Sequence, residues 1–259
     1  MTKLFLSFLI LLFPFTNDED ARRWGQSGHR ATGYIAAVHL TEAASNEVHR
    51  VLNGDSMAEA STWMDEVRSD PNFRFMSPWH YCTIPEGMTY EEAGTPDNGD
   101  ILWAIDKMVT ELKSGELSEE QEAINLKVLI HLVGDLHQPL HVGNGTDRGG
   151  NDVRVQWFGD GSNLHRVWDS EMIDSRQHDG RELADFSDDQ LTEELIEEWQ
   201  STNWLDWAYE SQALLPQVYD FEGDRMGYEY MFHNFETVEL RILQAGVRLA
   251  GLINEIYAE

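Results

Sequence analysis

Apolar residues recur at helical spacing along most of the chain. From Ser27 to about Ala43, and again from about Tyr228 to Tyr257, they fall three and four positions apart, as in amphipathic helices that bury one face. The same spacing, interrupted by Asn-Gly and proline breaks, predicts further helices at 46–52, 57–68, 98–113, 119–136, 164–173, 188–199 and 203–215. Because the chain has no internal repeat or low-complexity linker, the pattern predicts one all-α domain of packed helices.

Two places depart from this regular pattern. Residues 144–161 are rich in glycine and aspartate and contain an alternating run from Val153 to Phe158. Alternation between turn residues is typical of paired strands, so we expect a loop with one small β-hairpin near 151–162. In the long C-terminal helix, Gly246 marks the place where we expect a bend.

The N-terminus has the pattern of a signal peptide. Lys3 precedes an apolar run from Leu4 to Phe15, which is too short to cross a bilayer but has the length of a signal-peptide core. We therefore expect a signal peptide and cleavage region at 1–23, a mature domain at 24–259 without a membrane span, and a secreted or periplasmic location. A buried N-terminal helix is the alternative, and the segment ending in Arg22-Arg23 does not define the cleaved bond.

Composition narrows the choice of function. Cys82 is the single cysteine, so no intramolecular disulfide can stabilise an exported domain, and bound metal is a common substitute. The formal charge of −29 excludes the basic surface of an ordinary nucleic-acid-binding module. A nucleic-acid substrate would therefore need local positive charge, which divalent metal ions can supply.

Histidine and aspartate recur at the spacing of metal ligands. His131 and Asp135 fall one turn apart on a predicted helix, which Pro139 ends just before His141. His165 and Asp169 repeat this one-turn spacing. A single pair of this kind is more often a surface or core pair. Several sets in one helical domain predict a zinc hydrolase instead, because buried aspartate is rare unless it is paired or bound to metal.

The order of these residues resembles the zinc-dependent S1/P1 nuclease family, whose fold is shared with the bacterial zinc phospholipases C. The resemblance covers nearly the whole first half of the mature chain, and the remainder matches only as generic helices. The pieces that carry it are Trp24-Gly-x-x-Gly-His29, Trp63-x-Asp65, His80, His131-x-x-Gly-Asp135-x-x-Gln-Pro-Leu-His141, Gly149-Gly150-Asn151 and Asn163-Leu-His165-x-x-Trp-Asp169.

Carried over residue by residue, the resemblance implies three zinc ions. The implied ligands are Asp65, His80 and His131 for the first ion; the amine and carbonyl of Trp24 with His29 for the second; Asp135 as a bridge between these two; and His141, His165 and Asp169 for the third. Two close zinc ions can deprotonate a bridging water for in-line attack on phosphorus. Since the Trp24 amine is free only after processing, the full-length chain is expected to be a poorly active two-zinc precursor.

The resemblance also implies a substrate and its contacts. It implies cleavage of single-stranded DNA and RNA to 5′-phosphate products, with 3′-nucleotidase activity. No obligate protein partner is evident from the sequence. Arg68 would face the phosphoryl oxygens and stabilise transition-state charge. Tyr81 would stack on a base, and a stacked duplex base cannot reach such a pocket without unpairing. Thr83 stands where the fungal enzymes have an aspartate that contacts the base, so base preference is expected to differ.

Two alternatives remain open from the sequence. A zinc phospholipase C would carry a glutamate one turn after the last histidine ligand, where this chain has Asp169. A zinc-stabilised binding protein without catalysis would have fully coordinated metal ions, whereas the inferred sites have too few protein ligands for closure. The remaining histidines match no ligand position and are expected to be structural or exposed: His39, His49, His137, His178 and His233.

Overall fold

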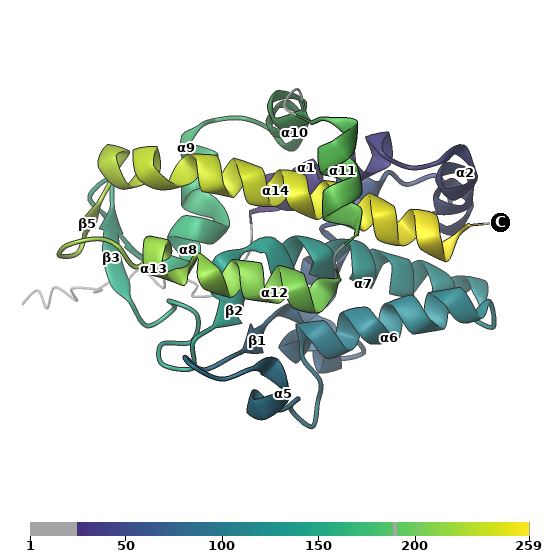
Figure 1. The fold of residues 1–259 in the computed structure, drawn as a ribbon, viewed down its shortest axis with the longest axis horizontal. Coiled ribbons are helices and arrows are strands. Elements are labelled where there is room, and N and C mark those ends of the chain that lie inside the picture. The colour runs from purple at the N-terminus through teal and green to yellow at the C-terminus, as the bar shows by residue number, and fades with distance from the viewer. Residues whose placement is uncertain (1–24, 189–190, 202, 259) are drawn as a thin grey trace, which may run out of the picture.

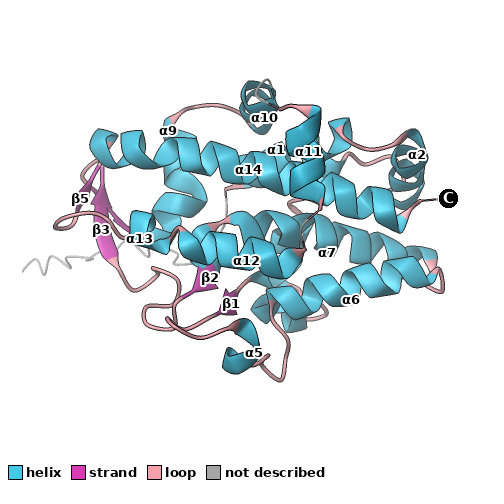
Figure 2. Ribbon diagram, in the orientation of Figure 1, coloured by secondary structure: helices cyan, strands magenta, loops and turns pink. Residues whose placement is uncertain are grey.

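Helices make up most of the chain in the computed structural model, which describes residues 25–188, 191–201 and 203–258 (Figure 1). Figure 2 shows that the few strands are short and lie beside the helical body. The prediction of an all-α fold is therefore confirmed. The predicted signal peptide, residues 1–23, and the predicted ligand Trp24 lie outside the described residues. Within the described part, no helix is long and apolar enough to cross a membrane.

The longer helices carry the architecture, and single turns connect them. The α-helices are α1 (Gln26–Val38), α2 (Glu42–Val51), α3 (Met57–Ala60), α4 (Trp63–Glu66), α5 (Tyr90–Ala93), α6 (Ile101–Ser114), α7 (Glu119–His137), α8 (Leu164–Arg166), α9 (Met172–Ser175), α10 (Gly180–Asp188), α11 (Glu193–Gln200), α12 (Trp204–Ala213), α13 (Leu215–Val218) and α14 (Tyr228–Ile256). Short 3-10 or π turns lie at Val67–Ser69, Arg74–His80, Pro139–His141 and Val167–Glu171.

Helix α7 is the centre of the fold. It packs against α1, α3, α4, α6, α12 and α14, and from Val128 to His137 each of its residues is buried. A helix that is apolar on all sides is expected in such a position. Yet α7 also buries His131, Asp135 and His137, and buried polar groups of this kind need partners.

Helices α1 and α14 approach each other closely through a glycine. A Cβ atom at Gly246 would lie 2.5 Å from the Ile35 side chain of α1. Gly246 therefore permits contact between the two helix backbones. The expected bend there is not a break, because α14 runs without interruption from Tyr228 to Ile256.

Two small sheets lie beside the helices. Strands β3 (Arg154–Trp157) and β4 (Asp160–Asn163) form the predicted hairpin, and β5 (Arg225–Met226) pairs in parallel with β3. Strands β1 (Cys82–Thr83) and β2 (Val142–Gly143) form a second, parallel pair that was not predicted. The β3–β5 and β1–β2 pairings each join segments that are distant in the sequence. Each pairing is only two residues long, which is too short for an alternation of apolar and polar residues to predict it.

Several predicted helices have different bounds in the structure. The helix expected from Ser27 to about Ala43 ends at Val38, and α2 begins at Glu42 instead of residue 46. The helix expected over 164–173 is interrupted by the π turn Val167–Glu171. The helix expected over 57–68 is split into α3, α4 and a 3-10 turn, because the Ser61 carbonyl accepts a hydrogen bond from the His131 imidazole instead of continuing the helical pattern. The helix expected over 188–199 begins later, at α11, where the Thr192 side chain accepts a hydrogen bond from Leu195 N.

Candidate metal centre

The C-terminal end of α7 brings three of the predicted ligands together. His131 and Asp135 lie one turn apart, with His131 Nε2 3.2 Å from Asp135 Oδ2. The helix ends at His137, and Pro139 begins a 3-10 turn that carries His141 back toward the helix. As a result, His141 Nδ1 lies 3.4 Å from Asp135 Oδ1.

The Asp135 carboxylate is the hub of the whole cluster. It is only 1% exposed, and its two oxygens face four imidazole rings. The ring nitrogens and their distances to the nearer oxygen are His29 Nε2 at 3.3 Å, His80 Nδ1 at 2.8 Å, His131 Nε2 at 3.2 Å and His141 Nδ1 at 3.4 Å. These rings come from α1, the turn Arg74–His80, α7 and the turn Pro139–His141. One carboxylate thus joins four separate segments.

Donor atoms in the cluster gather into three groups of ligand size. In each group, one donor atom per residue lies within 4.8 Å of the others. The groups are Asp65, His80 and His131; His29, His131 and Asp135; and His141, His165 and Asp169. The first and third are the sets that the resemblance implies, and the second contains the described members of the implied set that includes Trp24.

The third group is held by its own contacts. His165 Nε2 lies 3.0 Å from Asp169 Oδ2, and His141 Nε2 lies 3.3 Å from Asp169 Oδ1. The rings of His141 and His165 are stacked, with centroids 5.1 Å apart and an interplanar angle of 6°. The Gln138 side-chain amide donates a hydrogen bond to the Asp169 carboxylate, which fixes its orientation.

Backbone carbonyls orient three of the imidazole rings. The Nδ1 atom of His131 lies 2.7 Å from the Ser61 carbonyl, that of His141 lies 2.9 Å from the His80 carbonyl, and that of His165 lies 2.7 Å from the Gly149 carbonyl. A carbonyl oxygen can only accept a hydrogen bond, so each Nδ1 carries a hydrogen and donates the bond. In the neutral ring, each Nε2 then presents its lone pair, and this is the usual second-shell arrangement of metal-binding histidines.

Electrostatics in the cluster favour positive charge at its centre. Burial opposes charge on His131 and His141, but the facing carboxylates outweigh it and raise the pKa of each to about 9. Burial also opposes charge on Asp135, yet the facing imidazoles hold its pKa well below the usual range. For His29 and His80 burial dominates and lowers the pKa. Two protonated imidazoles therefore balance carboxylates that a metal cation would otherwise neutralise.

The donor set fits a borderline metal such as zinc. Imidazole nitrogen and carboxylate oxygen are ordinary zinc ligands, and each group is small enough to enclose one ion. In the part of the chain that the structure describes, His141 Nε2 and Asp169 Oδ2 are buried and lack a hydrogen bond of good geometry, although they lie 3.3 Å from Asp169 Oδ1 and 3.0 Å from His165 Nε2. Leaving buried polar atoms in this state is costly, and coordination of a cation would satisfy both.

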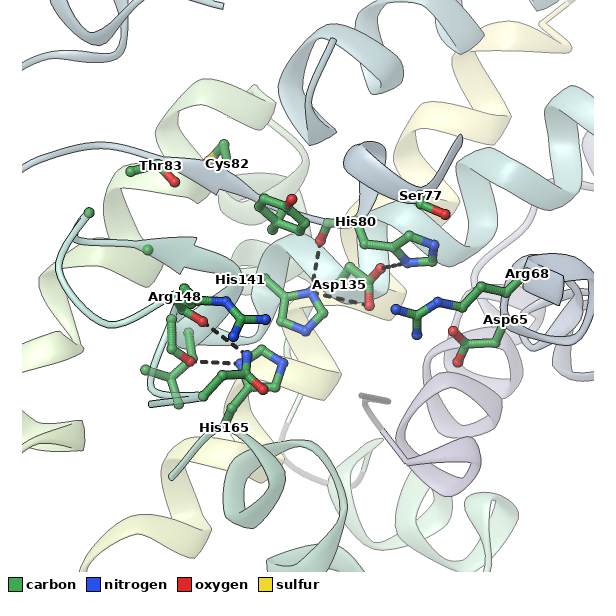
Figure 3. Close-up of a pocket in the computed structure, with 16 residues that line it drawn as sticks. Asp65, Arg68, Ser77, His80, Cys82, Thr83, Asp135, His141, Arg148 and His165 are labelled. Carbon is green, nitrogen blue, oxygen red and sulfur yellow. Dashed lines mark hydrogen bonds and ion pairs between the residues drawn. The ribbon is translucent and has the colours of Figure 1, made fainter. Parts of the chain in front are cut away.

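A cavity of about 320 Å³ opens onto the cluster. Figure 3 shows His80, Asp135 and His141 between two arginines, with Arg68 beside Asp65 at one end and Arg148 beside His165 at the other. The predicted residues Tyr81 and Thr83 also line the cavity, and the Tyr81 ring is half exposed. The position of Arg68 is compatible with a phosphate on the cluster, and a guanidinium suits that group.

The histidines expected to be structural lie outside the three groups. Of these, His137 is fully buried, and burial together with two nearby arginines lowers its pKa well below normal. Those arginines, Arg241 and Arg248 of α14, are themselves buried and share the carboxylate of Glu210. Arg248 donates to His137 Nε2 at 3.0 Å, so this ring is neutral and braces the end of α7.

Sequence reasoning missed three residues of the site. Gln138 orients Asp169, and Ser77 and Arg148 line the cavity. Gln138 and Arg148 stand inside or beside motifs that were recognised, so their positions offered a signal. Ser77 offered none, because a lone serine in an irregular segment has no distinguishing pattern.

Comparison with known proteins agrees with this geometry. A family model described as S1/P1 Nuclease matches residues 24–258. The chain is 30% identical over 272 residues to Endonuclease 3 of Arabidopsis thaliana, covering 91% of this chain and 89% of that protein. It is 29% identical over 273 residues to Endonuclease 2 of Arabidopsis thaliana, covering 90% of both chains.

The match to a fungal relative covers a similar share of both chains. Nuclease P1 of Penicillium citrinum is 26% identical over 273 residues, covering 90% of this chain and 98% of that protein. The family match spans nearly all of the described chain, including the segments that carry the three His and Asp groups. The chain belongs to the S1/P1 nuclease family, and it is a hydrolase of the S1/P1 endonuclease type.

Proposed function

We propose that the mature domain, residues 24–259, is a zinc-dependent endonuclease that cleaves single-stranded DNA and RNA to 5′-phosphate products. 3′-Nucleotidase activity is expected on the same site. The observation that carries the proposal is the arrangement of three His and Asp groups around Asp135 on one side of an open cavity that Arg68 also lines. A closed structural metal site would offer no such access.

The proposal assigns three zinc ions to the cluster. Their ligands would be Asp65, His80 and His131; Trp24 and His29; and His141, His165 and Asp169, with Asp135 bridging the first two ions. When bound, zinc would supply an activated water nucleophile and positive charge beside the phosphate. That local charge is needed here, because the chain as a whole carries −29 and repels polyanions at long range.

The protein's own residues would position the substrate. Arg68 would bind the non-bridging phosphoryl oxygens, where negative charge grows in the transition state. The half-exposed Tyr81 ring would stack on a base, and Thr83 would border that base. Threonine offers a hydroxyl in place of a carboxylate, so we expect weaker discrimination between bases than in enzymes with an aspartate there.

Substrate choice separates this proposal from the alternative of a zinc phospholipase C. The purified mature protein is assayed on a single-stranded 20-mer, the matching duplex and phosphatidylcholine vesicles, with EDTA and with zinc added back. We expect cleavage of the single strand, slower cleavage of the duplex, loss of activity in EDTA and recovery with zinc. Lipid cleavage without DNA cleavage, or DNA cleavage that resists EDTA, would overturn the proposal.

The proposed location is secreted or periplasmic, and it depends on removal of residues 1–23. Mass spectrometry of the exported protein should find Trp24 at the N-terminus. Metal analysis should find fewer zinc ions in the full-length chain than in the processed one, since only the processed chain has a free Trp24 amine. Equal zinc content in both forms would contradict the role given to Trp24.

A further inference from the structure

Arg148 occupies an unusual position in the wall of the cavity. Its backbone is left-handed, with a φ of 58°, a conformation that residues with a Cβ atom rarely adopt. Surrounding contacts hold it there: Gly150 N donates to the Asp147 carboxylate at 2.9 Å, and Asn151 Nδ2 donates to the Arg148 carbonyl at 2.9 Å. The next carbonyl, that of Gly149, faces His165 Nδ1 at 2.7 Å. The loop is therefore tied to the third ligand group.

The Arg148 side chain lies at the rim of the cavity. Figure 3 shows its guanidinium near His141 and His165, at the opposite end from Arg68. The side chain is 63% exposed, and its ion-pair partner among the described residues is Asp152, whose carboxylate is 3.4 Å away and 54% exposed. An ion pair of this length between two exposed groups is weak, so a phosphate could replace Asp152 as the partner of Arg148 at little cost.

The position relative to the ligand groups suggests which phosphate Arg148 would bind. This inference rests on the proposed function, in which the ions beside Asp135 would supply the water nucleophile. The separate group of His141, His165 and Asp169 would then hold the ion that stabilises the leaving 3′-oxygen, on the far side of the phosphorus. The nucleoside that carries this oxygen then lies at the end of the cavity where Arg148 stands. The next phosphate along the strand is the 5′-phosphate of that same nucleoside, and it would leave the cavity at the rim.

We propose that Arg148 is a substrate-positioning residue that binds the 5′-phosphate of the nucleotide whose 3′-oxygen is the leaving group. The planar guanidinium can donate two parallel hydrogen bonds to phosphate oxygens. Arg68 and Arg148 would thus contact two successive phosphates of one single strand. An enzyme with this contact would prefer longer single-stranded nucleic acids and 5′-phosphorylated fragments. Substrates that lack the 5′-phosphate would be cleaved less efficiently.

Two dinucleotides isolate this contact. Thymidylyl-thymidine has one phosphodiester bond, and its 5′-phosphorylated form adds only the phosphate in question. For the zinc-loaded wild-type enzyme, we expect kcat/KM to be about 3- to 10-fold higher on the phosphorylated form, as for a partly exposed charge-assisted pair. In Arg148→Ala the ratio should fall to about one. In Arg148→Lys it should be intermediate, because lysine keeps the charge but loses the two parallel bonds.

Matched controls separate this contact from general effects. Arg154→Ala removes one exposed arginine of β3 that does not line the cavity, and it should keep the wild-type ratio. Alanine and lysine at position 148 both keep a Cβ atom, so neither changes the backbone requirement of the loop, and thermal unfolding checks this. If turnover of the dinucleotides is too slow, their inhibition constants against cleavage of the 20-mer give the same ratio.

The outcomes distinguish a failure of the Arg148 assignment from a failure of the proposed function. A wild-type ratio of one, or an equal loss on both dinucleotides in Arg148→Ala, would overturn the assignment of Arg148 and leave the proposed function intact. An equal loss would point to contact with the base or with the scissile phosphate. If the wild-type enzyme neither cleaves the 20-mer nor binds either dinucleotide, the proposed function itself fails, and the assignment of Arg148 fails with it.

Discussion

Gly134 offers a test that separates the metal centre from the stability of the fold. It lies on α7 between the ligand candidates His131 and Asp135, and it faces α1. A Cβ atom at this position would lie 2.9 Å from His29 Nδ1 and 3.3 Å from His29 Cε1. Ordinary contacts begin at 3.4 Å, so Gly134→Ala creates an overlap of about 0.5 Å with the His29 ring.

Two opposing effects set the expected change in stability. Alanine is favoured over glycine in a helix by about 1 kcal/mol, whereas overpacking of a buried site costs about 1–3 kcal/mol. The free energy of unfolding of the metal-free protein should therefore fall by about 0–2 kcal/mol, which leaves the fold intact.

The effect on metal binding should be larger. The His29 ring stacks on His131 with centroids 4.0 Å apart, so it cannot retreat freely in that direction. Zinc–nitrogen distances tolerate only about 0.2 Å of error, which is less than the overlap. We expect Gly134→Ala to weaken the zinc ion held through His29 by about 10- to 100-fold, comparable to the loss of an orienting contact.

Chelator competition measures zinc affinity, and urea unfolding in EDTA measures stability. Gly251→Ala on α14 is the matched control, because its Cβ atom would meet the partly buried Gln200 side chain, away from the cavity. His29→Ala defines the full loss of this ion. If Gly134→Ala keeps wild-type zinc affinity while His29→Ala does not, the His29 ring moves freely and the reasoning from close packing is refuted. If neither variant changes zinc binding, His29 is not a ligand.

The Asp135 carboxylate, the raised pKa values of His131 and His141, and the buried arginine pair of α14 can each be tested separately. Asp135→Asn should lose two zinc ions by metal analysis and at least about 10³-fold in kcat/KM, since the bridging charge is gone; near-normal turnover would contradict the bridging role. Zinc affinity should rise with pH from 6 to about 9, with proton release measurable by calorimetry in two buffers, because zinc must displace protons from His131 and His141, whose pKa values are raised to about 9; an affinity independent of pH over this range would count against these ligands. Glu210→Gln should lower the free energy of unfolding in EDTA by about 2–4 kcal/mol, because the two buried arginines of α14 lose their shared carboxylate; unchanged urea unfolding would show that they do not depend on it.

Local geometry explains which parts of the site could be predicted. His131 and Asp135 were recognisable because helical spacing alone places them on one face, and Pro139 marked the turn that returns His141. Asp65 and His80 are different, because no periodicity links them to α7. Their grouping became an expectation only through the resemblance to a family, which adds knowledge of how distant segments meet.

Long-range contacts explain what the sequence did not reveal. The split between α3 and α4 depends on the Ser61 carbonyl, which bonds to a ring seventy positions further along the chain. The role of His137 depends on Arg248, which is more than a hundred positions away. Local propensity carries no information about such pairs. Arg148 was overlooked for another reason, since its proposed role depends on the direction of an exposed side chain.

The short parallel pair of β1 and β2 has a consequence for engineering base preference. The run His80-Tyr81-Cys82-Thr83 carries a ligand candidate, the proposed stacking ring and strand β1 in four consecutive residues, and β1 is registered to β2 directly after His141. The His80 carbonyl also contacts the His141 ring at 2.9 Å. Inserting or deleting a residue here would displace donor atoms as well as the base contact. Libraries that seek new base preference should therefore vary side chains at Tyr81 and Thr83 and keep the length of this segment fixed.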